Sequence, residues 1–455
     1  MRQWWQQGSP WVWLSASALL LCLGLFMALL GLIAVKGMQH FWPAPLVQFQ
    51  LSEQGSPTLG RLVRQISDRS EAATKGLWLL DRGDGLSKES AESTASSGRY
   101  LLLEAQQLLP ERPSNAVLVQ LHDGRTLYGT MLDAAEVWQS QEQAETGLWL
   151  ELASQRPVLL PAEDIRAYWL PNQLSWWQRG PVFWQEWRHF LTAAPSQNQS
   201  AGGIFPAIFG TLVMVLLMAV LVTPFGILAA IYLHEYAPKN WLTQLIRTSV
   251  YNLAGIPSVV MGVFGLAFFV YVLGGSLDRL FYADQLPAPT FGTPGLFWAA
   301  LTLALLTLPV VIVATEEGLS RLPQAQRLGS FALGATQAET IWKVVVPQAA
   351  PAMLTGLILA IARAAGEVAP LMLVGVVKSA PQLPVDTQFP FIHLERKFMH
   401  LGYHLYDVGF QSPDAEVAMS LVYTIGLVLL TLILLLNLSA FLLRQRLRRK
   451  YRLID

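Results

Sequence analysis

The sequence predicts an all-α membrane protein with six spanning helices and a strand-rich domain inserted between the first and second of them. Of the 455 residues, 53% are hydrophobic and only 14% are charged, which is too apolar for a soluble chain of this length. Six apolar runs reach the length of about 20 residues that a helix needs to cross a bilayer. Between the first two runs, from 36 to 203, the chain is more polar and carries strand and turn signals.

The six apolar runs are the predicted spans, at residues 11–35, 206–231, 250–273, 296–315, 350–376 and 418–443. The first is longer than the core of an ordinary signal peptide, and Arg2 is the only charged residue before it. We therefore predict an uncleaved anchor helix over 1–37. Cys22 is the sole cysteine and lies in this run, which excludes an internal disulfide, a thiolate metal cluster and a CxxC redox centre.

Lysines and arginines predict the orientation of the spans. They gather after the second, fourth and sixth spans, at Lys239, Arg247, Arg321, Arg327, Lys343, Arg444, Arg446, Arg448, Arg449, Lys450 and Arg452. We expect these segments and both termini to face the cytoplasm, although Lys378, Arg396 and Lys397 weaken the rule after the fifth span. The basic tail 444–455 is interpreted first as a stop signal and second as a site for anionic lipid. Because the net charge is zero, we expect no nucleic-acid partner.

This orientation places residues 38–200 outside the cytoplasm as a separate domain. Its β-type runs are 116–121 and 147–152, and 122–124 is a turn signal. Near its end, Trp176, Trp177, Trp184 and Trp187 alternate with charged residues. We expect this segment to lie at the headgroup level of the membrane, and a ligand-stacking platform is the less favoured alternative.

No segment of the sequence matches GxxxxGK[ST], and the dipeptide Gly-Lys is absent, so the chain has no predicted ATP-phosphate loop. We expect no enzyme activity, and any ATP hydrolysis would belong to another subunit. The loop 316–348 is the predicted docking place for that subunit. It contains two helical pieces, 328–333 and 336–346, which are separated at Gly334 and ended by Pro347. Glu316 and Glu317, at its start, are interpreted as interfacial charges that could pair with Arg321.

Span five is apolar or small except for Arg363 and Glu367. A charge at the centre of a bilayer costs about 2.5 to 3.5 kcal/mol even on lenient scales, so such residues persist when they pair or face a polar route. Their i, i+4 spacing allows an ion pair on one helix face, and Gly366 allows another backbone to approach. Two hypotheses remain equal: a purely structural pair, or an Arg363 that attracts an oxyanion while Glu367 orients its guanidinium.

The same regions resemble a known family. The run 333–336, with Ile341 and Pro347, resembles the cytoplasmic loop signature of ABC importer permeases, whose short coupling helix sits in a groove of the ATPase subunit. Leu328 and Gly329 stand where that signature usually has an acidic residue and an alanine. The run 362–371, around Arg363 and Glu367, is similar to phosphate importer permeases of the PstA type, as are 252–260 and 229–237.

The resemblance covers about 200–455 and implies a permease core over 201–443, in a bacterial inner membrane, that works by alternating access. It implies that an ATP-binding subunit dimer binds the coupling loop at Gly334, Ala335, Thr336, Ile341 and Pro347. It also implies a paralogous permease subunit, an extracytoplasmic phosphate-binding protein and a role for Arg363 and Glu367 in the passage of the anion.

Four alternatives remain open at this point. The chain could carry another oxyanion such as molybdate or sulfate, or be the paralogous phosphate permease subunit. It could instead be a membrane sensor with 36–203 as the receiver, or a secondary transporter, although no coupling-ion site is evident.

Histidines gather before span six, at His393, His400 and His404, with Glu395 nearby. His400 and His404 have the i, i+4 spacing of a zinc-binding pair. The aromatic residues around them favour a packed cap instead. We therefore expect no metal and no cofactor.

Overall fold

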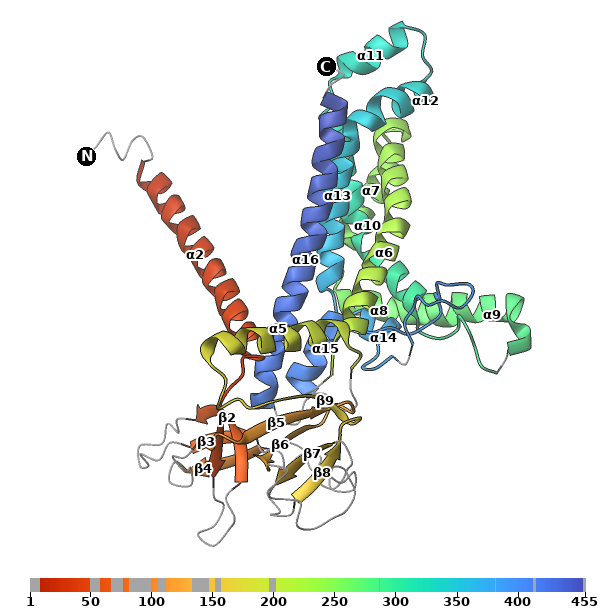
Figure 1. The fold of residues 1–455 in the computed structure, drawn as a ribbon. Helices are drawn as coiled ribbons and strands as arrows, with labels where there is room; N and C mark the ends of the chain where they lie inside the picture. Colours follow the sequence, from red (N-terminus) through yellow and green to blue (C-terminus); the bar gives the residue numbers. More distant parts are fainter. Residues whose placement is uncertain are drawn as a thin grey trace. The chain divides into compact units, whose positions relative to one another are not determined.

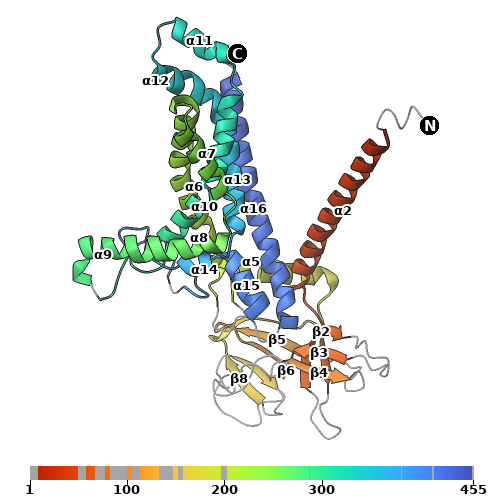
Figure 2. The same ribbon diagram turned by 180° about the vertical axis from the view of Figure 1, so that it is seen from behind.

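A computed structural model describes residues 9–49, 58–66, 77–81, 100–104, 112–132, 147–151, 157–195, 202–285, 287–380, 382–411 and 415–452. The chain divides into two compact units. Unit 1 is formed by residues 1–205 and 408–424, and unit 2 by 206–407 and 425–455. The helices and strands of both units are labelled in Figures 1 and 2.

Unit 1 contains a long apolar helix, two β-sheets and an amphipathic helix. Its elements are α2 (Ser9–Gln39), β1 (Leu46–Phe49), β2 (Thr58–Ile66), β3 (Leu77–Asp81), β4 (Tyr100–Glu104), β5 (Ala116–Leu121), β6 (Thr126–Met131), β7 (Gly147–Glu151), β8 (Pro157–Pro161), β9 (Ile165–Trp169) and α5 (Trp176–Thr192). The predicted strand-rich insert between the first two spans is therefore confirmed as a fold.

The strands form two antiparallel sheets, one in the order β1-β2-β3-β4 and the other in the order β8-β7-β6-β5-β9. The predicted turn joins β5 to β6, with Gly124 at a φ of 88°. Successive side chains of a strand point to opposite faces, and both faces of β5 are buried. Val117 and Val119 join one core cluster, whereas Ala116 and Leu118 join another that includes Leu46 of the other sheet. The two sheets thus share a core.

Helix α5 confirms the amphipathic segment that the tryptophans predict. Phe183, Glu186 and Phe190 are buried, whereas Trp176, Trp177 and Trp184 are exposed. The Glu186 carboxylate accepts hydrogen bonds from Arg166 Nη2 at 2.5 Å and from Gln120 Nε2 at 3.0 Å. These bonds fasten the buried side of α5 to the second sheet and leave Trp176, Trp177 and Trp184 uncovered.

Helix α2 has almost no packing partner within unit 1. The most apolar stretch of its span contains no buried residue. Near its C-terminal end, Thr424 Oγ1 donates to the Gly37 carbonyl at 2.9 Å, and His40 Nδ1 lies 2.8 Å from Ser420 Oγ. Burial lowers the pKa of His40 to about 3, so this imidazole is neutral at physiological pH.

Unit 2 is helical. Its elements are α6 (Phe205–Ile231), η2 (Tyr232–Tyr236), α7 (Trp241–Leu253), α8 (Ser258–Phe264), η3 (Gly265–Gly274), α9 (Gly275–Phe281), η4 (Ala283–Gln285), α10 (Leu296–Ser320), α11 (Gln324–Ala332), α12 (Gln337–Thr340), η5 (Ile341–Val345), α13 (Val346–Gly366), α14 (Leu371–Val374) and α15 (Leu401–Tyr406). The elements η6 (Asp407–Gln411) and α16 (Ala415–Arg452) cross the boundary between the units. The segments η2, η3, η5 and η6 are π-helical, and η4 is a 3-10 turn.

The core of unit 2 lies between α6, α10 and α13, which run side by side in both views (Figures 1 and 2). It is built from fully buried side chains that include Met214, Met218, Leu303 and Ala364. Helices α10 and α13 approach closely through small residues, because a Cβ atom added at Gly356 would lie 2.7 Å from that of Ala314. Small residues are what close helix packing in a membrane requires.

Six helices of the described residues are long and apolar enough to span a membrane, as the hydropathy pattern predicts. They are Trp11–Gln39, Phe205–Tyr236, Ser258–Phe281, Leu296–Ser320, Gln337–Gly366 and Ala418–Arg446. Residues 1–8 and 453–455, at the ends of the predicted anchor and tail, lie outside the described residues.

Two of the predicted spans have the wrong boundaries. The third was expected from 250, but the chain breaks after α7 and restarts at Ser258, because Pro257 has no N–H to continue a helix. The fifth was expected to continue to 376, but α13 ends at Gly366, before Pro370. A proline disfavours helical geometry in the residue before it, so the apolar segment after Gly366 turns and forms the short helix α14.

Candidate functional site

Arg363 and Glu367 form the predicted ion pair, with Arg363 Nε 3.3 Å from Glu367 Oε1. Arg363 lies in the last turn of α13, where the negative end of the helix dipole favours a cation. We expected Glu367 to lie on the same helix as Arg363. It is instead the first residue after the helix, in an extended conformation. The structure therefore confirms the contact and corrects its geometry: the two residues meet across the end of a helix.

The pair lies on the side of α13 that the subunit's own core does not cover. Ala364 and Ala365 are fully buried, whereas the side chains of Arg363 and Glu367 are 38 and 21% exposed. Gly366 is also open, since an added Cβ atom would meet nothing within 4 Å. The face on which Gly366 allows another backbone to approach is therefore left uncovered by the described residues of this chain.

The predicted coupling loop has its sharp bend at Gly334, as expected. Gly334 has a φ of 84°, the left-handed conformation that glycine adopts without strain. The Gly334 N–H donates to the Phe331 carbonyl at 2.9 Å, and the Ala335 N–H donates to that of Ser330 at 3.2 Å. These two bonds are the Schellman pattern that ends a helix. Thr336 then starts α12, with its hydroxyl and backbone N–H both bonded to Glu339.

Ile341 connects this loop to the rest of unit 2. It is buried in a cluster that includes Ile231 of α6 and Leu319 of α10. The expectation that Pro347 ends the second helical piece is wrong, because α13 continues through it. Pro347 is the second residue of α13, and the π-helical turn η5 lies directly before it, so the chain stays helical through the proline. The loop is thus continuous with the spanning helix.

Two ion pairs that the sequence analysis missed hold the base of the loop. Arg327 Nη2 lies 2.7 Å from Glu235 Oε1, and these side chains are only 17 and 12% exposed. Arg247 Nη2 lies 3.4 Å from Glu316 Oε1 and donates to the Leu233 carbonyl at 2.7 Å. The predicted partner of the glutamates, Arg321, pairs with the exposed Glu317 instead. Arg327 joins α11 to η2, the last part of the candidate span Phe205–Tyr236, so the loop is braced against that span.

We expect Arg327→Met to destabilise the protein by about 1.5 to 3 kcal/mol, because it removes a charge-assisted hydrogen bond to the part-buried Glu235 carboxylate, which then keeps only His234 Nδ1 nearby among the described residues. Chemical unfolding of the purified protein in mild detergent measures this loss. Arg321→Met is the matched control, since its pair is exposed on both sides and worth about 0 to 1 kcal/mol. Equal effects of the two variants would contradict the bracing role.

The histidine cluster forms a polar brace and a packed core. His393 Nε2 lies 3.0 Å from Asp386 Oδ1, and His393 Nδ1 lies 3.2 Å from Glu395 Oε1. Asp386 Oδ2 also accepts a hydrogen bond from Arg396 Nη1 at 2.5 Å. The Arg396 hydrogen bond is the main reason that the pKa of Asp386 is lowered to about 2. His400 is fully buried and caps α15 by accepting from the Gly402 N–H. Among the described residues, no group of three potential ligands is placed to hold a metal ion.

Known proteins share the helical part of the chain. Residues 222–452 match the family described as "Binding-protein-dependent transport system inner membrane component". The "Probable ABC transporter permease protein YqgI" of Bacillus subtilis is 30% identical over 234 residues, which cover 50% of this chain and 74% of YqgI. The "Phosphate transport system permease protein PstA" of Yersinia pestis is 33% identical over 253 residues, which cover 55% of this chain and 75% of that protein.

Among solved structures, the chain is similar to one of the MetNI methionine ABC transporter in an inward-facing conformation. The TM-score is 0.39 at 19% sequence identity, and the match covers 53% of this chain and 94% of that one.

The family match covers half of the chain and contains both the coupling loop and the Arg363–Glu367 pair. Proteins of this family are membrane components that hydrolyse no ATP themselves, and the ATPase is a separate subunit. This agrees with the absence of a phosphate-binding loop from the sequence. The chain therefore belongs to the family of binding-protein-dependent transport system inner membrane components, as an ABC importer permease of the PstA type.

Proposed function

We propose that this chain is a permease subunit of an ATP-driven phosphate importer and forms half of its translocation pathway. The observation that carries the proposal is the Arg363–Glu367 pair on the uncovered face of α13. Glu367 lies next to Nε of Arg363, and no partner contacts the two terminal Nη groups among the described residues. A planar guanidinium held in this way presents several donors to an oxyanion such as phosphate.

A second permease subunit, a paralogue of this one, completes the pathway in this proposal. A charged pair that faced lipid would be costly, whereas one that faces a polar route between two subunits is stabilised by it. The exposure of Arg363 and Glu367 in the isolated chain supports this arrangement. The names of the PstA relatives support phosphate as the anion.

An ATP-binding subunit dimer drives the cycle through the coupling loop. Leu328, Phe331 and Leu333 expose apolar side chains on α11 and its C-cap, and that of Leu333 is 90% exposed. These side chains, with Gly334, Ala335 and Thr336, form the proposed contact with the ATPase. Burial of Ile341 against α6 and α10 lets the loop move these spanning helices as a rigid body, and alternating access follows.

The charge pattern supports the proposed orientation of the chain in the membrane. Both termini face the cytoplasm, and the strand-rich domain over 38–200 lies outside, in a bacterial inner membrane, where an extracytoplasmic phosphate-binding protein delivers the anion. The exposed tryptophans of α5 lie at the membrane surface, since aromatic rings favour the headgroup region. The insert either contacts the binding protein or the second permease subunit, or serves only as a scaffold, and these alternatives are equal.

Uptake by a reconstituted complex tests the function. The chain is co-expressed with the proteins that copurify with it in mild detergent, reconstituted in vesicles that contain ATP, and supplied with radiolabelled anions and the binding protein. We expect ATP-dependent phosphate uptake that excess sulfate or molybdate does not reduce. Uptake of sulfate or molybdate in its place would show a permease for another oxyanion, and copurification without an ATPase would favour a membrane sensor.

A further inference from the structure

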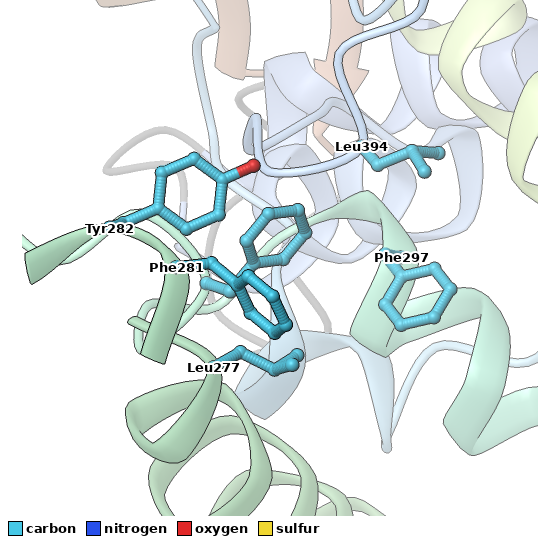
Figure 3. A pocket seen from close by; sticks show the side chains of 6 residues that line it. Leu277, Phe281, Tyr282, Phe297 and Leu394 are labelled. Carbon is cyan, nitrogen blue, oxygen red and sulfur yellow. The ribbon is translucent and has the colours of Figure 1, made fainter. Parts of the chain in front are cut away.

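A cavity of about 500 Å³ lies where α9 and the loop after it meet the start of α10. Its lining residues are shown in Figure 3 and are Leu277, Phe281, Tyr282, Phe291, Phe297 and Leu394. Apart from the Tyr282 hydroxyl, these side chains carry no polar atom. The volume falls within the range of sites that bind small molecules in proteins, about 300 to 1,000 Å³. None of the residues proposed for phosphate transport lines it.

The wall of this cavity is fixed by hydrogen bonds to the backbone. Asp278 is buried in α9 and accepts from the N–H groups of Phe291 and Gly292, at 2.8 and 2.7 Å. Trp298 Nε1 donates to the Phe291 carbonyl at 2.7 Å, so the Phe291 backbone is held from two sides. On the opposite wall, the Phe297 N–H donates to the Leu394 carbonyl at 2.9 Å. Hydrogen bonds therefore fix the backbone of the two walls formed by Phe291 and by Phe297 with Leu394.

The surface around the cavity indicates whether water or lipid surrounds the opening of the cavity. Leu277 and Phe281 end the candidate span Ser258–Phe281, and Phe297 is the second residue of the span Leu296–Ser320. The side chains of Leu280 and Phe281 are 75 and 74% exposed, so apolar surface continues from the spanning helix to the cavity. Such surface is unfavourable in water but matches the hydrocarbon region of a bilayer. Lipid chains are thus the molecules most concentrated at its opening.

We propose that this cavity binds one acyl chain of a bilayer phospholipid. Apart from the Tyr282 phenol, no ionisable side chain lines the cavity, so it selects the chain and not the headgroup. Within unit 2, α9 lies at the end opposite to α11 and α12 (Figures 1 and 2). In the proposed orientation the lipid therefore comes from the outer leaflet. The bound chain fills space between α9 and the start of α10, which stabilises their spacing by van der Waals packing.

Photolabelling of the purified complex in lipid nanodiscs tests this site. The probe is a phosphatidylglycerol with a diazirine on its acyl chain, and labelled peptides are located by mass spectrometry. We expect label in the peptides that contain Leu277, Phe281 and Phe297. Leu277→Trp and, from the other wall, Phe297→Trp fill the cavity and should each lower this label at least fivefold. Leu280→Trp adds the same side chain on α9 outside the cavity and should change it less than twofold.

A second probe, phosphatidylethanolamine with the same acyl-chain diazirine, should label the same peptides equally. The proposal is overturned if filling and control variants are labelled alike, if label depends on the headgroup, or if the wild-type peptides stay unlabelled because another subunit covers them. Label on α16 in the same samples confirms that each variant is folded and embedded. Phosphate uptake is not the readout, so failure here leaves the proposed function untouched.

Discussion

Replacement of Arg363 by alanine is expected to lower ATP-dependent phosphate uptake about 10- to 100-fold. A hydrogen bond to a charged group contributes about 1.5 to 3 kcal/mol, which corresponds to that range of affinity. Arg363→Ala removes the donors that face the proposed pathway and leaves the buried neighbours Ala364 and Ala365 in place. Assembly should be retained, as measured by copurification of the other subunits. Initial rates of labelled phosphate uptake in vesicles provide the measurement.

Arg363→Lys separates charge from geometry. Lysine keeps the cation but loses the planar set of donors, so we expect uptake between that of the wild type and that of the alanine variant. Glu367→Gln tests the orienting role and should lower uptake less than Arg363→Ala does, because the cation remains. Normal phosphate accumulation by an assembled Arg363→Ala variant would remove the pair from the pathway and leave it a structural ion pair.

Gly334→Pro is expected to uncouple ATP hydrolysis from transport, with uptake falling more than tenfold while hydrolysis continues. Proline fixes φ at about −65°, whereas Gly334 has a φ of 84°. It also lacks the N–H that donates to Phe331, so the end of α11 loses one of its two closing bonds. The contact with the ATPase would then no longer be rigidly connected to α13. Phosphate uptake and ATP hydrolysis are measured in the same vesicles, and the result is the number of phosphate ions transported per ATP hydrolysed.

Gly329→Ala is the matched control for that variant. Gly329 lies in α11 of the same loop, its φ is not positive, and an added Cβ atom meets nothing within 4 Å. Alanine is a better helix former than glycine, so this change should leave both activities unaltered. A Gly334→Pro transporter with the wild-type ratio of phosphate to ATP would show that the bend does not transmit the motion.

Hydropathy alone located the six spans because a run of about 20 apolar residues reports the thickness of the bilayer without any tertiary information. It failed at the ends of two of them. Apolar side chains continue beyond Gly366, so the pattern extended the helix to 376, whereas the backbone constraint of Pro370 redirects the chain. At Pro347 the prediction ended a helix that in fact continues. A proline usually ends or kinks a helix, but here the helix continues through it, with the π-helical turn η5 directly before it, and the sequence does not indicate that turn.

The coupling loop shows the same division between local and distant information. The bend at Gly334 and the cap at Thr336 follow from neighbouring residues, and both were predictable. The pair of Glu235 with Arg327 joins residues that are 92 positions apart, and no periodicity indicates it. For the same reason, the partner of Glu317 was predictable from the sequence and the partner of Glu316 was not. Glu317 reaches Arg321 one helical turn away, whereas Glu316 faces Arg247 on another helix.

Helix α2 carries a consequence for how this subunit could be modified. Along most of the helix its apolar side chains are not buried within unit 1, and its described hydrogen bonds to that unit lie near its C-terminal end. Within its own unit, the sequence of this segment is therefore constrained by its length and its hydrophobicity, and not by the shape of a neighbouring element. An unrelated single-pass tether of equal span should be exchangeable for it, provided the junction around Gly37 and His40 is kept.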